Sequence, residues 1–266
     1  MRPVRRKRGL RTHGIELAKV VVEGATMRTT GYLALSRQAA LERDMAVIAN
    51  NLANATTTGF RAEHTVFAET LQRVGRRAVA FTADQAQARD LAPGPITQTG
   101  NRLDVALDGP GYLAFAGAGG VRYGRAGRLE IDAEGRLVNM QGQALLDDSG
   151  NPITLALDDT SIAIAGDGTV SGRQGPIGRI GIAAFSNEQT LRPTGGGMYA
   201  APTAPSPELP ATRLVQGALE GSNVQPVLEM TAMVATVRAF EGAQRLLDTQ
   251  HDLERQAIER TVRAVG

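Results

Sequence analysis

A long amphipathic helix is predicted near the front of the chain by Leu33-Ala-Leu-Ser-Arg-Gln-Ala-Ala-Leu-Glu-Arg-Asp-Met-Ala-Val-Ile-Ala-Asn-Asn-Leu-Ala-Asn54. Apolar residues recur in it at alternating spacings of four and three, which places them on one helix face. They are Leu41, Met45, Ile48, Leu52 and Ala55. We expect the helix to run from about Thr30 to Ala55. The sequence Ala55-Thr-Thr-Thr-Gly59-Phe60 predicts its end, because threonines are poor helix formers, Gly59 can supply a left-handed cap, and Phe60 can fold back as the accompanying apolar contact.

A second helix is predicted at the back of the chain, after Gly217-Ala-Leu-Glu-Gly-Ser-Asn-Val-Gln-Pro226. Either Ser222 or Asn223 can cap it, and Pro226 is tolerated in a first helical turn. Val227, Met230, Val234 and Val237 keep the same spacing of four and three. An apolar face continues after them, with a drift in phase near Gly242, through Phe240, Leu247, Leu253, Ile258 and Val262. This helix reaches about Ala264 and would be roughly 60 Å long. A small β domain cannot cover so long an apolar stripe, so we expect other helices to cover it.

The middle of the chain predicts short strands. Residues 112–115 and 121–123 flank Gly117-Ala-Gly-Gly120 as one hairpin, and residues 129–131 and 137–138 flank Asp132-Ala-Glu-Gly135 as another. Short strands at near-regular spacing favour a compact antiparallel barrel or sandwich. A stiff Pro-rich linker follows, with Pro202-Thr-Ala-Pro-Ser-Pro-Glu-Leu-Pro210 as its main part.

The sequence therefore predicts an α+β protein whose terminal helices form one coiled-coil-like domain around a central antiparallel β domain. We expect a basic leader at residues 1–26, disordered or a start-site extension, and the first helical half of the assembly domain at 27–60. An extended connector with some β pairing is expected at 61–102. The central β domain is expected at 103–201, the return linker at 202–216 and the second helical half at 217–266.

Charge is distributed unevenly along the chain. Residues 1–26 hold seven basic and two acidic residues, a net charge of +5, and residues 27–266 hold 22 basic and 25 acidic residues, a net charge of −3. The body is thus mildly acidic, which argues against a nucleic-acid partner. No stretch approaches the roughly 18 apolar residues that indicate a membrane span, so we expect no membrane insertion. The chain has no cysteine, which excludes disulfides and cysteine-ligated metals.

Chemistry-bearing motifs are sparse, and we expect no enzymatic activity, cofactor or metal. The pairs Asp147-Asp148 and Asp158-Asp159 lie beside turn-forming residues and are interpreted as turns rather than as a hydrolase site. Asn50, Asn51 and Asn54 are unusual in a helix, because asparagine competes for backbone hydrogen bonds. They could cap the helix end, or they could bridge the backbones of neighbouring subunits.

Four separated motifs resemble the flagellar axial-protein family, the rod and hook subunits of bacterial flagella. Ala49-Asn-Asn-Leu-Ala-Asn54 with Thr58-Gly59-Phe60 is similar to the N-terminal signature of the family, and Gly221-Ser-Asn-Val-Gln-Pro-Val-Leu-Glu-Met230 with Arg238-Ala-Phe-Glu241 to its C-terminal counterpart. Pro95-Ile-Thr-Gln-Thr-Gly-Asn101 and Leu103-Asp-Val-Ala-Leu-Asp-Gly-Pro-Gly-Tyr112 resemble the central region of rod proteins. Residues 34–42 are more similar to proximal-rod members, and Phe240 stands where distal-rod members usually have tyrosine.

The resemblance implies a structural subunit of the rod, which crosses the periplasm and transmits torque. It also implies export by the flagellar type III apparatus without a cleaved signal, and partners among the other rod subunits. The assembly interface would comprise Leu41, Met45, Ile48, Asn50, Asn51, Leu52, Asn54, Val227, Met230, Val234, Val237 and Phe240. A distal-rod subunit remains an alternative. A β-rich binding module or adhesin would account for the centre of the chain but not for its complementary helical ends.

Overall fold

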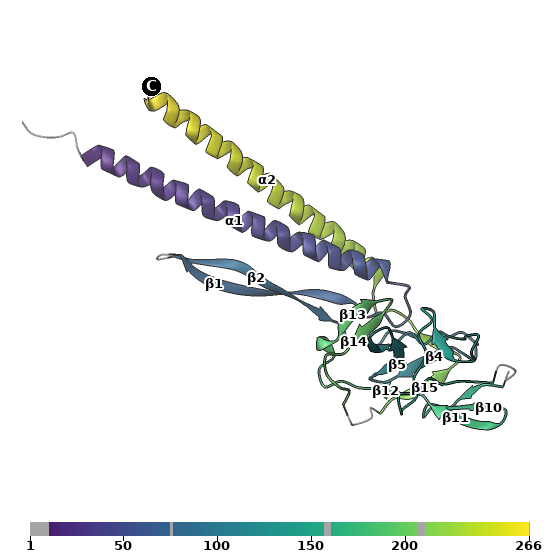
Figure 1. Ribbon diagram of the computed structural model, residues 1–266. Coiled ribbons are helices and arrows are strands. Elements are labelled where there is room, and N and C mark those ends of the chain that lie inside the picture. The colour runs from purple at the N-terminus through teal and green to yellow at the C-terminus, as the bar shows by residue number, and fades with distance from the viewer. Residues whose placement is uncertain (1–10, 75–76, 157–160, 207–210, 266) are drawn as a thin grey trace, which may run out of the picture. The chain divides into compact units, whose positions relative to one another are not determined.

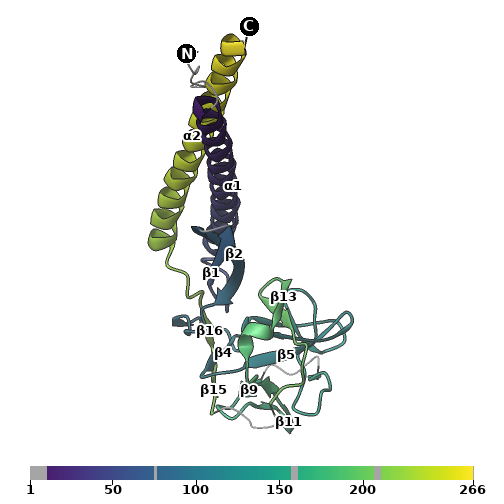
Figure 2. The same cartoon turned by 90° about the vertical axis from the view of Figure 1, so that its left-hand side faces the viewer.

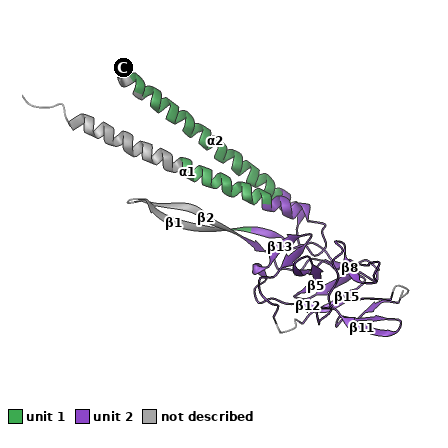
Figure 3. Cartoon of the chain, in the orientation of Figure 1, with its two compact units in different colours: residues 1–46, 65–86, 231–266 green, residues 47–64, 87–230 purple. Residues whose placement is uncertain are grey.

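A computed structural model describes residues 11–74, 77–156, 161–206 and 211–265 (Figure 1). Helix α1 (Arg11–Ala53) precedes the strands, and helix α2 (Pro226–Val265) follows them. The chain divides into two compact units (Figure 3). We call residues 1–46, 65–86 and 231–266 the helical unit, and residues 47–64 and 87–230 the β unit. The predicted α+β class is confirmed.

The helical unit brings α1 and α2 together in antiparallel directions. The Asp44 carboxylate accepts hydrogen bonds from the hydroxyl of Thr65 at 2.6 Å and from that of Thr236 at 3.1 Å. Farther along, Gly31 lies beside Gln250, whose side-chain oxygen is 3.5 Å from the position that a Cβ at Gly31 would occupy. Asp44, which the sequence pattern places off the apolar face of the first helix, thus faces the interior of this unit.

The bounds of the first helix differ from the prediction at both ends. It begins at Arg11 rather than near Thr30, so residues 11–26 are helical. A mixed sequence such as Ile15-Glu-Leu-Ala-Lys-Val-Val-Val-Glu23 lacks a clean apolar stripe but contains no helix-breaking proline, which explains why the periodic pattern missed this extension. The helix ends at Ala53, two residues before the predicted end.

The β unit consists of small antiparallel sheets around an apolar core. The largest sheet has the strand order β12-β5-β6-β14-β13, and β11-β10-β9 form a three-stranded sheet. Both predicted hairpins are confirmed: β5 pairs with β6 from Leu113↔Gly124 to Gly117↔Gly120, and β7 pairs with β8. The strands are β4 (Val105–Asp108), β5 (Tyr112–Gly117), β6 (Gly120–Gly124), β7 (Leu129–Ile131), β8 (Leu137–Asn139), β9 (Ala163–Ile164), β10 (Thr169–Gly172), β11 (Gly175–Arg179), β12 (Ile182–Ala183), β13 (Arg192–Gly195) and β14 (Met198–Ala200), with the 3-10 helix η1 at Glu188–Thr190.

The two larger apolar clusters of this unit lie among its strands. The larger cluster joins inward-facing residues of most of its strands, among them Leu113, Phe115 and Val170, each with no exposed surface. The smaller cluster is aromatic: Tyr112 lies edge-on to Phe185 and to Tyr199, with ring centres 6.1 and 6.0 Å apart. Several strands bury consecutive residues, as β4 does with Val105, Ala106 and Leu107, so the strands of this unit lie within its core rather than exposing one face.

Several segments expected to be linkers are strands. The predicted connector at 61–102 contains β1 (Glu63–Val74) and β2 (Arg77–Arg89), which pair with each other, and β3 (Ile96–Gln98). The predicted return linker ends in β15 (Arg213–Gln216), which pairs with β4, and the expected C-terminal helical half begins with β16 (Ala218–Glu220), which pairs with β3. Figure 2 shows β16, β4 and β15 together. Strands β15 and β16 are short, and their partners β4 and β3 lie more than a hundred residues earlier in the chain. Local sequence could therefore not reveal these two pairings.

Candidate functional site

The apolar stripe predicted on the second helix is exposed to solvent. The exposed fractions are 74% for Val227, 54% for Met230, 51% for Val234 and 37% for Val237. All four residues lie in the first turns of α2, at spacings of three and four. Monomeric proteins rarely leave a contiguous row of large apolar side chains without a partner. This row is therefore a candidate interaction surface, and we call it the α2 stripe.

Phe240 does not belong to this stripe. It is half-buried, and it falls in a different row of α2 that turns toward the chain itself, with Thr236 facing Asp44 and Gln250 facing Gly31. This inward row also has spacings of three and four, and its members are Glu229, Met233, Thr236, Phe240, Ala243, Leu247, Gln250 and Glu254. The apolar residues of α2 are thus divided between two faces, and the change of face begins at Phe240, slightly before the drift in phase predicted near Gly242.

A further row on α2, exposed except at the half-buried Ala239 and Gly242, was missed from sequence. It consists of large apolar residues at its ends and small residues between them: Leu228, Ala232, Ala235, Ala239, Gly242, Leu246 and Leu253. Leu228, Leu246 and Leu253 are 61%, 49% and 48% exposed, and nothing lies within 4 Å of where a Cβ at Gly242 would sit. The regular spacing of its alanines was the available signal. We call it the small-residue row.

The residues predicted on the first helix lie mostly toward the interior of the chain. Ile48 is only 6% exposed, and Leu41, Met45 and Leu52 are half-buried. Asn50 is exposed. The apolar stripe of α1 is thus largely covered within this chain, in contrast to the stripe of α2.

Asn51 is a bridge between three elements of the β unit. Its side chain donates to the Glu63 carbonyl at 2.8 Å and to the Glu229 carboxylate at 3.2 Å, and it accepts from the Glu63 amide at 2.9 Å. Asn54 donates to the carbonyl of Asn50 at 2.9 Å, within the end of α1. Asn51 therefore bridges groups of its own chain, and bridging between neighbouring subunits stays a prediction.

Gly59 has the predicted left-handed conformation, with φ of 67°, but it does not cap the helix. The helix already ends at Ala53, and the Gly59 amide donates to the Glu220 carbonyl at 2.9 Å. A Cβ at Gly59 would lie 2.5 Å from the carbonyl carbon of Arg125, so the glycine permits a close approach of two backbones. Phe60 folds back as expected and packs with Ala55, Ala62 and Val224.

The second predicted cap also has another role. The Asn223 side chain accepts from the Ala62 amide at 2.7 Å and donates to the carbonyls of Asp90 at 3.2 Å and Ala92 at 3.0 Å. The Ser222 hydroxyl accepts from the Val224 amide, so neither side chain caps α2. Helix α2 begins at Pro226, three to four residues after the predicted caps, so Pro226 lies in the first turn, as predicted. Asn223 thus fastens the segment before α2 to the segment after α1.

The described residues give little support for a catalytic site. The Asp147 carboxylate accepts from the Ser149 and Asn151 amides at 2.9 and 2.7 Å, which confirms its role in a turn, whereas Asp158-Asp159 lie outside the described residues. Among side chains that the structure describes, no three His, Asp or Glu residues gather as a metal site requires. Within the same limits, no helix is long and apolar enough to cross a membrane.

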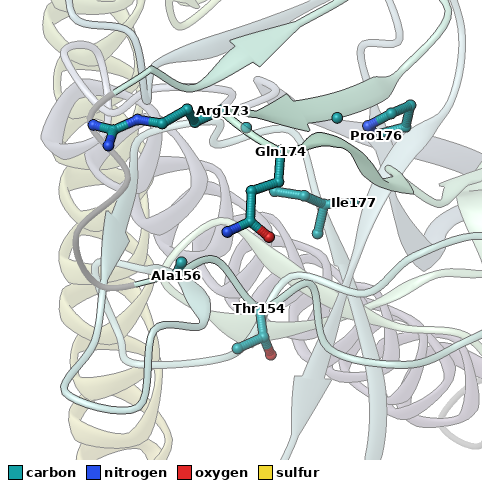
Figure 4. Close-up of a pocket in the computed structure, with 8 residues that line it drawn as sticks. Thr154, Ala156, Arg173, Gln174, Pro176 and Ile177 are labelled. Atoms are coloured by element: carbon teal, nitrogen blue, oxygen red, sulfur yellow. The ribbon is translucent and has the colours of Figure 1, made fainter.

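A polar pocket of about 350 Å³ lies beside β10 and β11, lined by residues 154, 156 and 172–177 (Figure 4). Gln174 reaches toward Thr154, while the Arg173 guanidinium extends away from them. The lining residues include no carboxylate, histidine or buried nucleophile, so the pocket lacks the groups of a hydrolytic site.

The most perturbed phenol belongs to the aromatic cluster. Burial raises the pKa of Tyr112, and its hydrogen bond to the Glu188 carboxylate, 2.6 Å away, raises it further. Arg89 stacks on the Tyr199 ring at 4.1 Å and donates to the carbonyls of Glu188 and Leu191. These groups are buried and paired with one another, which marks them as structural.

Comparisons with known proteins point to a single family. Three family models match: "Flagella basal body rod protein" at residues 32–61, "Flagellar hook protein FlgE/F/G D1 domain" at 106–172, and "Flagellar basal body rod FlgEFG protein C-terminal" at 215–260. The flagellar basal-body rod protein FlgF of Caulobacter vibrioides is 38% identical over 238 residues, covering 86% of this chain and 96% of the relative. FlgF of Mesorhizobium japonicum is 34% identical, covering 83% and 92%.

FlgG relatives match as well, which bears on the alternative expected from sequence. The flagellar basal-body rod protein FlgG of Agrobacterium fabrum is 31% identical over 245 residues, covering 80% of this chain and 92% of the relative. The higher identity to FlgF proteins agrees with the similarity of residues 34–42 to proximal-rod members. The chain belongs to the flagellar basal-body rod protein family and is FlgF-like.

Proposed function

We propose that this chain is a structural, non-enzymatic subunit of the bacterial flagellar rod that polymerises through its terminal helices. The observation that carries the proposal is the α2 stripe, in which Val227, Met230 and Val234 are each at least half exposed. Burying such side chains against a neighbour is favourable by roughly 25 cal/mol per Å² of apolar surface. Assembly would bury this row, whereas in a free monomer the row gains no burial energy.

The α2 stripe and the small-residue row lie on two different faces of one helix. The inward row of α2 is already directed toward α1, so these two faces remain available for helices of neighbouring rod subunits. Spacings of three and four are the repeat of a coiled coil, and small residues allow two helices to approach closely. We therefore propose a coiled-coil-like layer in which α2 contacts helices on both of these faces.

Membership of the rod family supports further proposals about partners and place. The chain would contact copies of itself and neighbouring rod proteins in the basal body, within a rod that spans the periplasm and transmits torque. It would reach that place through the flagellar export apparatus without a cleaved signal. The type assigned is the proximal-rod FlgF subunit, with the distal-rod FlgG type as the alternative.

Assembly of the purified full-length chain and rescue of mutant cells test this function together. We expect concentration-dependent polymerisation in sedimentation assays, and restored motility in a strain lacking FlgF. Rescue of a strain lacking FlgG instead would assign the distal type. A chain that stays monomeric at high concentration and rescues neither strain would contradict the proposal, and sugar binding by that monomer would favour an adhesin.

A further inference from the structure

A buried carboxylate in the β unit is shared by two arginines. The Glu220 side chain is 1% exposed, and its Oε2 lies 2.6 Å from Nε of Arg125, whose side chain is 2% exposed. Its Oε1 lies 3.3 Å from Nη2 of Arg61, whose side chain is 6% exposed. We call these three side chains the Glu220 cluster. The sequence pattern gave no reason to single them out.

Each arginine also binds the backbone of a different segment. Arg125 donates to the carbonyls of Gly111 at 2.5 Å and of Leu107 and Gly109 at 3.1 Å each, which surround the turn between β4 and β5. Arg61 donates to the carbonyls of Leu91 and Ala92, which follow β2. The cluster therefore connects three parts of the chain that are distant in sequence.

Glu220 itself accepts two backbone hydrogen bonds in addition. Its carbonyl accepts from the Gly59 amide at 2.9 Å, and its carboxylate accepts from the Gly94 amide at 3.1 Å. A Cβ at Gly94 would lie 2.1 Å from the carbonyl oxygen of Gly221, so these backbones also approach closely. Glu220, the last residue of β16 in the segment that precedes α2, thus binds the segment that follows α1 and the backbone at Gly94.

The charges of the cluster are not balanced. Two guanidinium groups share one carboxylate in a site that is nearly closed to water, and Nε of Arg61 has no acceptor among the described residues. Burial lowers the pKa of Arg61, and the nearby positive charge of Arg125 lowers it further, while Glu220 opposes both effects. Removing one partner of a buried ion pair leaves a charge without compensation. The negative charge of Glu220 is therefore what allows both guanidiniums to remain in place.

We infer that Glu220 is a positioning residue that holds the segments at the two helix ends, Gly59–Ala62 and Glu220–Val224, against the rest of the β unit. The Phe60 cluster adds apolar contact between the same segments, but it consists of small groups around one aromatic ring. The Glu220 cluster instead supplies fixed directions, through two ion pairs and its bonds to backbone groups. This inference concerns the single chain, so its failure would leave the proposed assembly untouched.

Glu220→Gln in the full-length chain tests the inference, because glutamine keeps the shape and loses the charge. The readout is amide hydrogen exchange measured residue by residue on the soluble chain. We expect exchange of the Gly59, Gly94 and Ala62 amides to accelerate by about tenfold or more, while the Leu145 amide in the β core changes far less. Glu134→Gln is the matched control, since it removes the same charge from a surface ion pair whose glutamate side chain is 65% exposed.

A second variant keeps the test decisive if Glu220→Gln fails to fold. Arg61→Met removes the guanidinium that has an unpaired Nε and leaves one balanced pair, so it should fold and should accelerate exchange of Ala62 more than that of Gly94. Unchanged exchange at Gly59 and Gly94 in Glu220→Gln would overturn the inference. Equal acceleration at Leu145 would overturn it too, since it would indicate general destabilisation rather than a local lock.

Discussion

Val234→Asp, a change in the α2 stripe, separates the effect on assembly from the effect on folding. Val234 is 51% exposed, so an aspartate there remains solvated in the free chain. Valine and aspartate also have similar helix propensities. We therefore expect the free energy of unfolding to change by no more than about 0.5 kcal/mol, the usual range for surface substitutions.

The effect on assembly should be much larger. Full burial of an aliphatic side chain contributes about 1.5–3 kcal/mol, so covering the exposed part of the four stripe residues would contribute about 4 kcal/mol per subunit. Aspartate at Val234 removes about 1 kcal/mol of this and adds a poorly paired carboxylate at the contact, for a total loss of about 3 kcal/mol. Because 1.4 kcal/mol corresponds to a tenfold change, the critical concentration should rise by about a hundredfold.

Sedimentation across a concentration series measures this change, with thermal melting of the soluble chain as the test of folding. Arg245→Gln is the matched control: it shifts the net charge by the same one unit from an exposed position beyond the end of the stripe. We expect the control to polymerise normally. Normal polymerisation of Val234→Asp itself would refute the reasoning, as would a large loss of thermal stability in the soluble variant.

Predictions for three other variants and for one proteolysis experiment follow from the same structure. Ile48→Asp should lower the free energy of unfolding by about 3 kcal/mol, because the side chain is 6% exposed, and an unchanged melt would show that the site is open. Gly59→Ala should cost about 2 kcal/mol in urea unfolding, given φ of 67° and the close backbone contact, and a cost near zero would contradict this. Limited proteolysis of the monomer should leave a product that extends to about Met230, whereas one ending near residue 205 would mean that β15 and β16 are not stably paired. Deleting residues 1–26 should leave assembly and motility intact, and lost motility at normal protein levels would show that the leader is functional.

The fold class and the local elements could be predicted from sequence because their signals are local. The hairpin around residues 117–120 requires only a glycine-rich turn between two apolar strands, and it was confirmed, with strands that extend slightly farther into the turn than predicted. The place of Pro226 in the first turn of α2 follows from the same kind of signal. By contrast, β15 and β16 were assigned to a linker and a helical half, because nothing within a few residues of them indicates partners far away in the chain.

The interaction surface was predicted only in part, because periodicity gives the face of a helix but not what covers it. Val227, Met230, Val234 and Val237 form the predicted stripe and are exposed. Ile48, in the corresponding stripe of the first helix, and Phe240, which was expected to continue the apolar face of the second, face the chain itself. The sequence indicates that Gly59 and Asn223 are special residues but predicts the wrong roles for them. Gly59 binds Glu220 and Asn223 binds Ala62, and both partners are far away in sequence. Tertiary contacts decide these roles.

Site-directed cross-linking in isolated basal bodies tests the central claim most directly. The chain contains no cysteine, so Val234→Cys introduces a single thiol, and Arg245→Cys provides the matched position beyond the stripe. With a photoactivatable label on that thiol, we predict cross-links from position 234 to another rod subunit, and few or none from position 245. Assembled, motile flagella in which position 234 reacts only as a free, solvent-exposed thiol would contradict the claim that the α2 stripe is a subunit contact.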